Sequence, residues 1–265
     1  MKVACIQMCS VLDPKANLKQ AEYWLAEAAR QGAELTVLPE NFTSMGATEQ
    51  DKLASAEPQE SSSLLLFLSK QAARHKMTII GGTVLLQADH GKVRNVCAAY
   101  GADGSVLASY DKIHLFDGDV GEDSYRESSI VQPGKTPCSF QLNDYSIGLS
   151  ICYDLRFPEL FRHYSQHGCH VLCVVAAFTD VTGRAHWETL LKARAIENQT
   201  YVLASAQWGK HPDGRRTWGH SMIIDPWGKT LAELPAGDGL VSAELDGEHI
   251  RNIRHFLPVL QHRVL

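Results

Sequence analysis

Hydrophobic and polar positions follow one another along the chain in a pattern that predicts strands and helices in regular succession. Short apolar runs rich in Val, Ile and Ala are typical of buried strands, whereas apolar residues that recur every three or four positions are typical of amphipathic helices. In the first half this pattern predicts strands at residues 2–8, 34–40, 77–86, 94–104 and 105–112, with helices at 16–32 and 62–76.

The second half repeats this order of elements, although its residues are different. It predicts strands at 145–151, 169–178, 200–207, 219–225 and 229–234, with helices at 158–168 and 186–199. Within each half the helices can cover only one face of a sheet. Two such sheets would bury their bare faces against each other, so we expect an α/β fold. Its form would be an α-β-β-α sandwich, with two stacked mixed sheets covered by helices on their outer faces, in a single domain over residues 1–265.

Composition and charge narrow the classes of function. The net charge of −5 argues against a binder of nucleic acid or anionic membranes, because both need a basic face. No apolar run approaches the roughly 20 residues of a membrane span, and the N-terminus leads directly into a strand rather than a signal peptide. The seven cysteines show no paired spacing. We therefore expect reduced thiols and a cytoplasmic protein.

Three chemically useful residues follow three different predicted strands. Glu40, Lys112 and Cys152 come at strand ends, where open α/β sheets build their sites. Taken singly, each has a simpler explanation, as a loop acid, a surface lysine and a small buried hydrophobe. Together they form a set for nucleophilic catalysis. Glu40 could take the thiol proton, and the Lys112 ammonium could lower the thiol pKa and stabilise an oxyanion.

Three segments resemble the glutamate, lysine and cysteine motifs of the nitrilase (carbon–nitrogen hydrolase) superfamily: "LPEN", "YDKIHLFD" and "CYDLRFPEL". The resemblance covers nearly the whole chain and implies the same sandwich fold. It also implies hydrolysis of a non-peptide amide or related C–N bond, without metal or cofactor, and assembly into dimers. The second glutamate used by the family matches Glu127 in "SYRESS". Glu127 would position Lys112 and the substrate rather than transfer the first proton, and a surface loop acid is the alternative explanation.

The chemistry that this set supports is acyl transfer through a thioester on Cys152. The oxyanion would be held by Lys112 and by the backbone N–H of Tyr153, the residue after the nucleophile. Phe178 and Trp187 could form a wall on the acyl side of the pocket. Cys169 and Cys173, in an apolar strand, are better explained by core packing than by a zinc site, which would need further convergent ligands.

Two further segments, "AQWGKH" and "GRRTWGHSM", look most like the deaminated glutathione amidase branch. This branch implies hydrolysis of deaminated glutathione to 2-oxoglutarate and cysteinylglycine. The substrate carries carboxylates at both ends, so its site needs cations besides the lysine. Four residues could meet the distal carboxylate: Lys210, His211, Arg215 and Arg216.

Other functions remain open at this point. The same thiolate chemistry would serve an ω-amidase acting on 2-oxoglutaramate, a nitrile hydrolase or an N-carbamoyl amino-acid hydrolase. A catalytically silent relative that acts as a binding or scaffold protein is the non-enzyme alternative. The presence of Glu40, Lys112 and Cys152 together favours an enzyme.

The C-terminal segment predicts self-association. Phe256, Leu257, Val259 and Leu260 follow the last predicted regular element and need a surface to cover them. We therefore expect a homodimer or higher homo-oligomer, with residues 256–265 at the interface.

Overall fold

The computed structural model describes residues 1–45, 48–121 and 123–264, and within them the first of two large sheets has seven strands. These are β1 (Lys2–Gln7), β2 (Leu35–Val37), β3 (Thr78–Ile80), β4 (Val84–Gln87), β5 (Val93–Tyr100), β6 (Val106–Asp111) and β17 (Gly239–Glu244). The order is β17-β1-β2-β3-β5-β4, and β6 also pairs with β5. β1, β2 and β3 are parallel, and the remaining pairings are antiparallel.

The second sheet is built in the same way around a parallel centre, β10-β11-β12. Its strands are β9 (Ser139–Leu142), β10 (Tyr145–Ile151), β11 (Val171–Ala176), β12 (Tyr201–Ala206), β15 (Ser221–Ile224) and β16 (Thr230–Leu234). Their order is β16-β15-β12-β11-β10-β9. Two small hairpins stand apart from both sheets: β7 (Asp117–Val120) with β8 (Asp123–Arg126), and β13 (Trp208–Lys210) with β14 (Arg216–Trp218).

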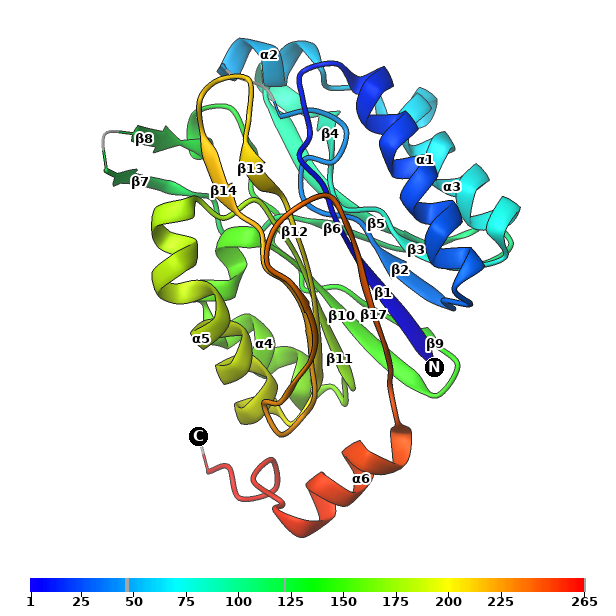
Figure 1. Ribbon diagram of the computed structural model, residues 1–265. Helices are drawn as coiled ribbons and strands as arrows, with labels where there is room; N and C mark the ends of the chain where they lie inside the picture. The colour runs from blue at the N-terminus through cyan, green and yellow to red at the C-terminus, as the bar shows by residue number, and fades with distance from the viewer. Residues whose placement is uncertain (46–47, 122, 265) are drawn as a thin grey trace.

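The helices lie outside the two stacked sheets (Figure 1). They are α1 (Pro14–Arg30), α2 (Glu49–Ala54), α3 (Ser63–His75), α4 (Pro158–Gln166), α5 (Asp180–Asn198) and α6 (Gly247–Phe256). α1 and α3 cover the first sheet, and α4 and α5 cover the second. The predicted α-β-β-α sandwich is therefore confirmed. No helix in the described part of the chain combines the length and the hydrophobicity needed to cross a lipid bilayer.

Strand β1 shows how the sequence pattern produces two cores. Successive strand side chains point to opposite faces of a sheet. Val3 and Cys5 therefore pack in the core between the sheets, together with Leu149 of β10. Ala4 and Ile6 face the other way and pack with residues of α1 and α3. Because both faces are buried, the strand is a continuous apolar run rather than an alternating one.

The predicted strand at residues 77–86 is divided into β3 and β4, and the cause lies at Gly82. Its φ of +56° belongs to the left-handed region, and a Cβ atom there would lie 2.1 Å from the Pro39 carbonyl oxygen. Only glycine permits this approach. The Thr83 hydroxyl then accepts a hydrogen bond from the Asn41 N–H at 2.9 Å. The contacts of Gly82 with Pro39 and of Thr83 with Asn41 thus fix the position of the segment that contains Glu40.

The structure also differs from the prediction at the start of one helix and in two elements that were not predicted. α5 begins at Asp180, six residues before the prediction, because the Thr179 side chain caps it by accepting from the Thr182 N–H. β17 and α6 were not predicted. β17 completes the edge of the first sheet by pairing antiparallel with β1, although it lies more than 230 residues from it in sequence.

Candidate active site

The structure brings the three predicted catalytic residues to one cavity. Glu40 follows β2, Lys112 follows β6 and Cys152 follows β10, and all three line a cavity of about 340 Å³. Their exposed fractions are 3%, 2% and 9%. A cavity of this volume is at the lower end of the range for small-molecule sites.

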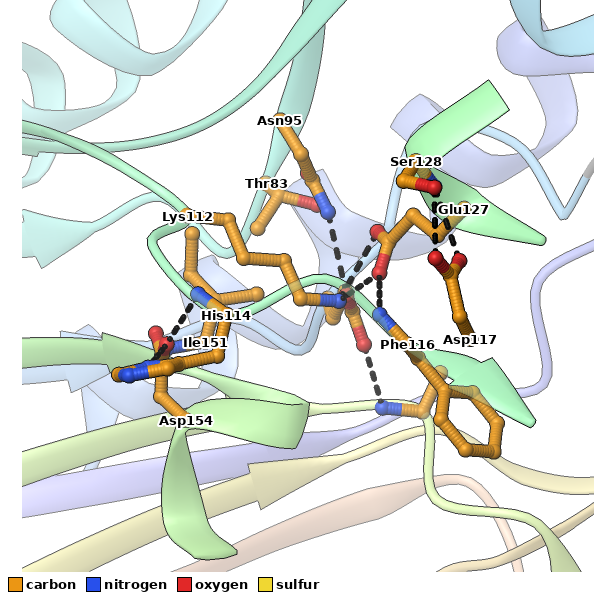
Figure 2. Close-up of polar contacts among 12 residues, drawn as sticks. Thr83, Asn95, Lys112, His114, Phe116, Asp117, Glu127, Ser128, Ile151 and Asp154 are labelled. Carbon is orange, nitrogen blue, oxygen red and sulfur yellow. Dashed lines mark hydrogen bonds and ion pairs between the residues drawn. The ribbon is translucent and has the colours of Figure 1, made fainter. Parts of the chain in front are cut away.

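Lys112 is the centre of a buried ion-pair network (Figure 2). Its Nζ lies 3.1 Å from Glu40 Oε1 and 2.9 and 2.8 Å from the two carboxylate oxygens of Glu127. Burial alone lowers the pKa of Lys112, but the carboxylates of Glu127 and Glu40 outweigh burial and hold the pKa well above its usual value. Lys112 is therefore an ammonium ion throughout the physiological pH range.

The Glu40 carboxylate is oriented by donors from three different elements. Besides Lys112, the Asn95 side-chain amide of β5 donates to Oε1 at 3.1 Å, and the Ala177 N–H after β11 donates to Oε2 at 2.9 Å. Asn95 is 3% exposed and was not predicted as a site residue. The signal that could have identified it is an asparagine within the strand at residues 93–100. A buried side-chain amide needs a polar partner.

Cys152 begins a short 3₁₀ turn, Cys152–Arg156, directly after β10. Its φ is +50°, a left-handed conformation that costs a non-glycine residue about 1–2 kcal/mol. This sharp change of direction ends the strand and leaves the thiol in the wall of the cavity. A strained turn of this kind at a nucleophile exposes the reactive atom to a substrate.

The thiol of Cys152 is held in its protonated form. Burial raises its pKa well above the usual value, and the Glu40 charge raises it further; Lys112 and the Ala177 N–H oppose this without outweighing it. Lys112 therefore lowers the thiol pKa, as expected, but burial and Glu40 together raise that pKa by more than Lys112 lowers it. Glu40 and Cys152 line the same cavity, and the Glu40 charge acts on the thiol pKa, so a candidate base lies near its proton.

Glu127 lies just after β8, and its side chain is only 14% exposed. In addition to Lys112, it accepts a hydrogen bond from the Phe116 N–H at 2.7 Å (Figure 2). The surrounding loop is fixed by Ser128, whose N–H and hydroxyl donate to Asp117 at 3.0 and 2.6 Å. Glu127 is therefore an integral part of the lysine network rather than a solvated loop acid.

Asp154 joins the segment that contains Lys112 to the turn that begins at Cys152. It is fully buried and accepts hydrogen bonds from the Tyr110 hydroxyl at 2.7 Å, the His114 N–H at 3.0 Å and the Ile151 N–H at 2.9 Å. His114 Nδ1 lies 2.7 Å from the same carboxylate (Figure 2). One carboxylate thus fixes β6 and its continuation against the end of β10, which sets the distance between Lys112 and the thiol.

The predicted acyl-side wall must be corrected. Within the described residues neither Phe178 nor Trp187 lines the cavity. Trp187 is fully buried, its indole N–H donates to the His220 carbonyl at 2.9 Å, and its ring packs against Phe178 at a centroid distance of 4.9 Å. The physical reason is that α5 begins early, which places Trp187 inside the helix and against the second sheet. The Tyr153 ring lies 5.0 Å from that of Phe116, and the role of its backbone N–H stays a prediction.

The four residues proposed for the distal carboxylate divide into two groups. Arg215 and Arg216 line the cavity. His211 is 2% exposed, and its two ring nitrogens contact the Ser10 carbonyl at 2.9 Å and the Thr217 hydroxyl at 2.8 Å.

The fourth residue, Lys210, is exposed and does not line the cavity within the described part of the chain. His211 is excluded from a direct substrate contact because both its nitrogens are engaged. Two other cations, Lys52 and Arg126, line the cavity but were not predicted, since the segment that contains Lys52 is short and polar and has no clear periodicity.

Comparisons with known proteins agree with this arrangement. Residues 2–255 match the family model "Carbon-nitrogen hydrolase". The chain is 44% identical over 266 residues to a deaminated glutathione amidase of Synechocystis sp. (strain PCC 6803 / GT-S), an alignment that covers 98% of this chain and 97% of the relative. It is 37% identical over 264 residues to human omega-amidase NIT2, which covers 99% of this chain and 94% of that protein.

A solved structure also matches. It is a mutant of the amidase from Nesterenkonia sp. AN1 that shows the result of Michael addition of acrylamide at the active site cysteine. The TM-score is 0.82 and the sequence identity 25%, with 98% of both chains covered.

Proposed function

The chain belongs to the carbon–nitrogen hydrolase family and is a cysteine-dependent amidase, and from this premise we propose that its substrate is deaminated glutathione. Hydrolysis would release 2-oxoglutarate and cysteinylglycine. The observation that carries this proposal is the position of Arg215 and Arg216, which line the same cavity as Cys152. They supply positive charge for a substrate with a second, distal carboxylate. The higher identity to a deaminated glutathione amidase than to an ω-amidase supports the same choice.

The proposed reaction proceeds in two halves. Glu40 takes the proton of the Cys152 thiol, and the thiolate attacks the amide carbonyl while Lys112 and the Tyr153 N–H stabilise the oxyanion. Glu40 then protonates the departing amine, and a thioester remains on Cys152. Water activated by Glu40 releases the acid. The raised thiol pKa supports this sequence, because a protonated nucleophile needs an adjacent base. Glu127 holds and orients Lys112.

Substrate preference is the direct test of this proposal. We expect kcat/KM for deaminated glutathione to exceed that for 2-oxoglutaramate by about tenfold or more, because one added charge-assisted hydrogen bond has this value. Intact glutathione should be a poor substrate, since its ammonium group would enter a cavity lined by cations. The measurement is release of cysteinylglycine from the first substrate and of ammonia from the second, on the same purified protein.

The ω-amidase is the second candidate, and the 37% identity to human omega-amidase NIT2 favours it over a nitrile hydrolase or an N-carbamoyl amino-acid hydrolase. A preference for 2-oxoglutaramate would establish it in place of our proposal. A preference for a nitrile or an N-carbamoyl amino acid would overturn both. Absence of turnover in a screen of small amides would instead indicate a catalytically silent binding or scaffold protein.

We also propose that the chain is one domain whose segment 256–265 lies between two copies. Phe256 and Leu257 at the end of α6 are 79% and 43% exposed, while Leu265 is outside the described residues. Light scattering at micromolar concentration should give at least twice 29.3 kDa. Phe256→Asp should shift the mass toward that of the monomer, whereas Leu66→Asp, at an exposed position on α3, should not. A wild-type monomer would contradict the proposal.

The state of the cysteines supports a location in the cytoplasm. All seven cysteines lie within the described residues, and none forms a disulfide. Thiols persist in reducing compartments, so the cytoplasm is the proposed site of action.

A further inference from the structure

Among the described side chains that line the cavity, cations outnumber carboxylates. The cations are Lys52, Lys112, Arg126, Arg215 and Arg216, and the carboxylates are Glu40, Glu127 and Asp213. The outer cations come from three segments that are far apart in sequence: α2, β8 and the β13–β14 hairpin. These segments lie at the same end of the molecule (Figure 1). Among the lining residues Arg126 and Arg216 are exposed, whereas Glu40, Lys112 and Cys152 are buried, so the outer cations mark the mouth of the cavity.

The outer cations differ in whether a carboxylate forms an ion pair with them. Arg126 lies 3.1 Å from Asp119, and Arg215 contacts Asp213. In contrast, the ammonium of Lys52 has no hydrogen-bond or ion-pair partner among the side chains that the structure describes, which leave out those of residues 46, 47, 49, 122, 123 and 265. The Lys52 side chain is nevertheless half-buried. A half-buried lysine in the wall of a substrate cavity, without a carboxylate of its own, is positioned to bind an anionic ligand.

The surroundings of Lys52 make an anion there especially favourable. Burial lowers the pKa of Lys52, and repulsion from the Arg215 guanidinium lowers it further, while Glu127 and Glu40 oppose the shift. Those two carboxylates are already held by Lys112. A ligand carboxylate close to both Lys52 and Arg215 would relieve their repulsion and form charge-assisted hydrogen bonds with each.

We propose that Lys52 and Arg215 form a subsite for the carboxylate at the leaving-group end of the substrate, and that Lys52 selects for peptide-like amides. This inference rests on the proposed function, because it concerns the part of deaminated glutathione that 2-oxoglutaramate lacks. The ligand class is an amide whose departing amine carries a terminal carboxylate.

The leaving-group end is favoured over the acyl end by the direction of the cavity. Cys152, Glu40 and Lys112 lie at the carboxyl ends of strands in the interior, and the acyl group must stay bonded to Cys152 during the reaction. The amine is the part that departs to solvent. A long amine therefore extends from these residues toward the mouth, where α2 and the β13–β14 hairpin lie.

The test compares three substrates that differ only beyond the scissile bond. They are deaminated glutathione, its analogue with a C-terminal carboxamide in place of the carboxylate, and 2-oxoglutaramate. The variants are Lys52→Met, Lys52→Arg to restore the charge, and Lys70→Met as a matched control at an exposed position on α3. Thermal unfolding establishes that each variant is folded.

We expect Lys52→Met to lower kcat/KM for deaminated glutathione by about 10- to 100-fold, mainly by raising KM. A loss of this size corresponds to one hydrogen bond to a charged group. The carboxamide analogue and 2-oxoglutaramate should change by less than about twofold. Lys52→Arg should recover most of the loss, and Lys70→Met should behave as wild type.

Two outcomes would overturn the subsite. One is an unchanged kcat/KM for deaminated glutathione in Lys52→Met. The other is an equal loss on all three substrates, which would place Lys52 at the acyl group or assign it a structural role. Failure of the proposed function is seen separately, in the wild-type enzyme, as a preference for 2-oxoglutaramate over deaminated glutathione. The comparison of carboxylate with carboxamide still tests Lys52 in that case.

Discussion

Cys152→Ala is expected to reduce turnover by about four orders of magnitude or more while leaving the fold intact. Loss of the nucleophile removes the thioester route entirely, and such losses are among the largest in enzymes. Only one small side-chain atom is removed, so the free energy of unfolding should fall by about 1 kcal/mol. Product release and thermal unfolding measure the two effects.

The matched control is Cys173→Ala, which removes a buried thiol of β11 in the core between the sheets. It should lower stability by a similar amount and retain turnover. Mass spectrometry of the wild type during reaction should show an acyl adduct on Cys152, absent from the alanine variant. Activity of Cys152→Ala above a few per cent of wild type would rule out this residue as the nucleophile.

Lys112→Met is expected to impair both activity and stability. Turnover should fall by about 1,000-fold, because the developing oxyanion loses its only charged donor in the proposed mechanism. The free energy of unfolding should fall by about 3–5 kcal/mol, since Glu40 and Glu127 are left as buried carboxylates without their shared cation. Kinetics and denaturant unfolding measure the two losses, with Lys70→Met as the surface control.

The rate of alkylation of Cys152 gives a separate measurement of how the Lys112 charge affects the thiol. Lys112 lowers the thiol pKa, so its removal should raise that pKa further and reduce the thiolate fraction at a given pH. Iodoacetamide should therefore label the variant more slowly than wild type between pH 7 and pH 9. Labelling at an equal or higher rate, or turnover close to wild type, would show that Lys112 does not stabilise negative charge in this site.

Much of the fold could be predicted because its central strands carry strong local signals. β1, β10, β11 and β12 are continuous apolar runs, and α1 and α3 have clear helical periodicity with buried and exposed faces. Three of the elements that were missed have little signal of their own. α2 has six residues, and β7 and β8 have four each and lie in polar sequence. Such segments form because of what they pack against.

The candidate catalytic residues were predictable for a similar reason. Glu40, Lys112 and Cys152 each follow a recognisable strand, and carboxyl ends of strands are where sites form. The positions of Lys52 and Trp187 were not predictable, because each depends on where a short helix or a helix start lies in space. Trp187 is buried because α5 begins at Asp180, and Lys52 lines the cavity because α2 lies at its mouth.

The sequence by itself determined the two-layered sheet core, the order of its central strands and helices, and the candidates for nucleophile, base and lysine. These follow from apolar periodicity and from residue types at strand ends, which are local properties. Only the tertiary structure decided the ionisation of Cys152 and the surroundings of Lys52. A pKa depends on burial and on charges brought close by distant segments. Glu40 and Cys152 are 112 positions apart, yet they line one cavity and the Glu40 charge raises the thiol pKa.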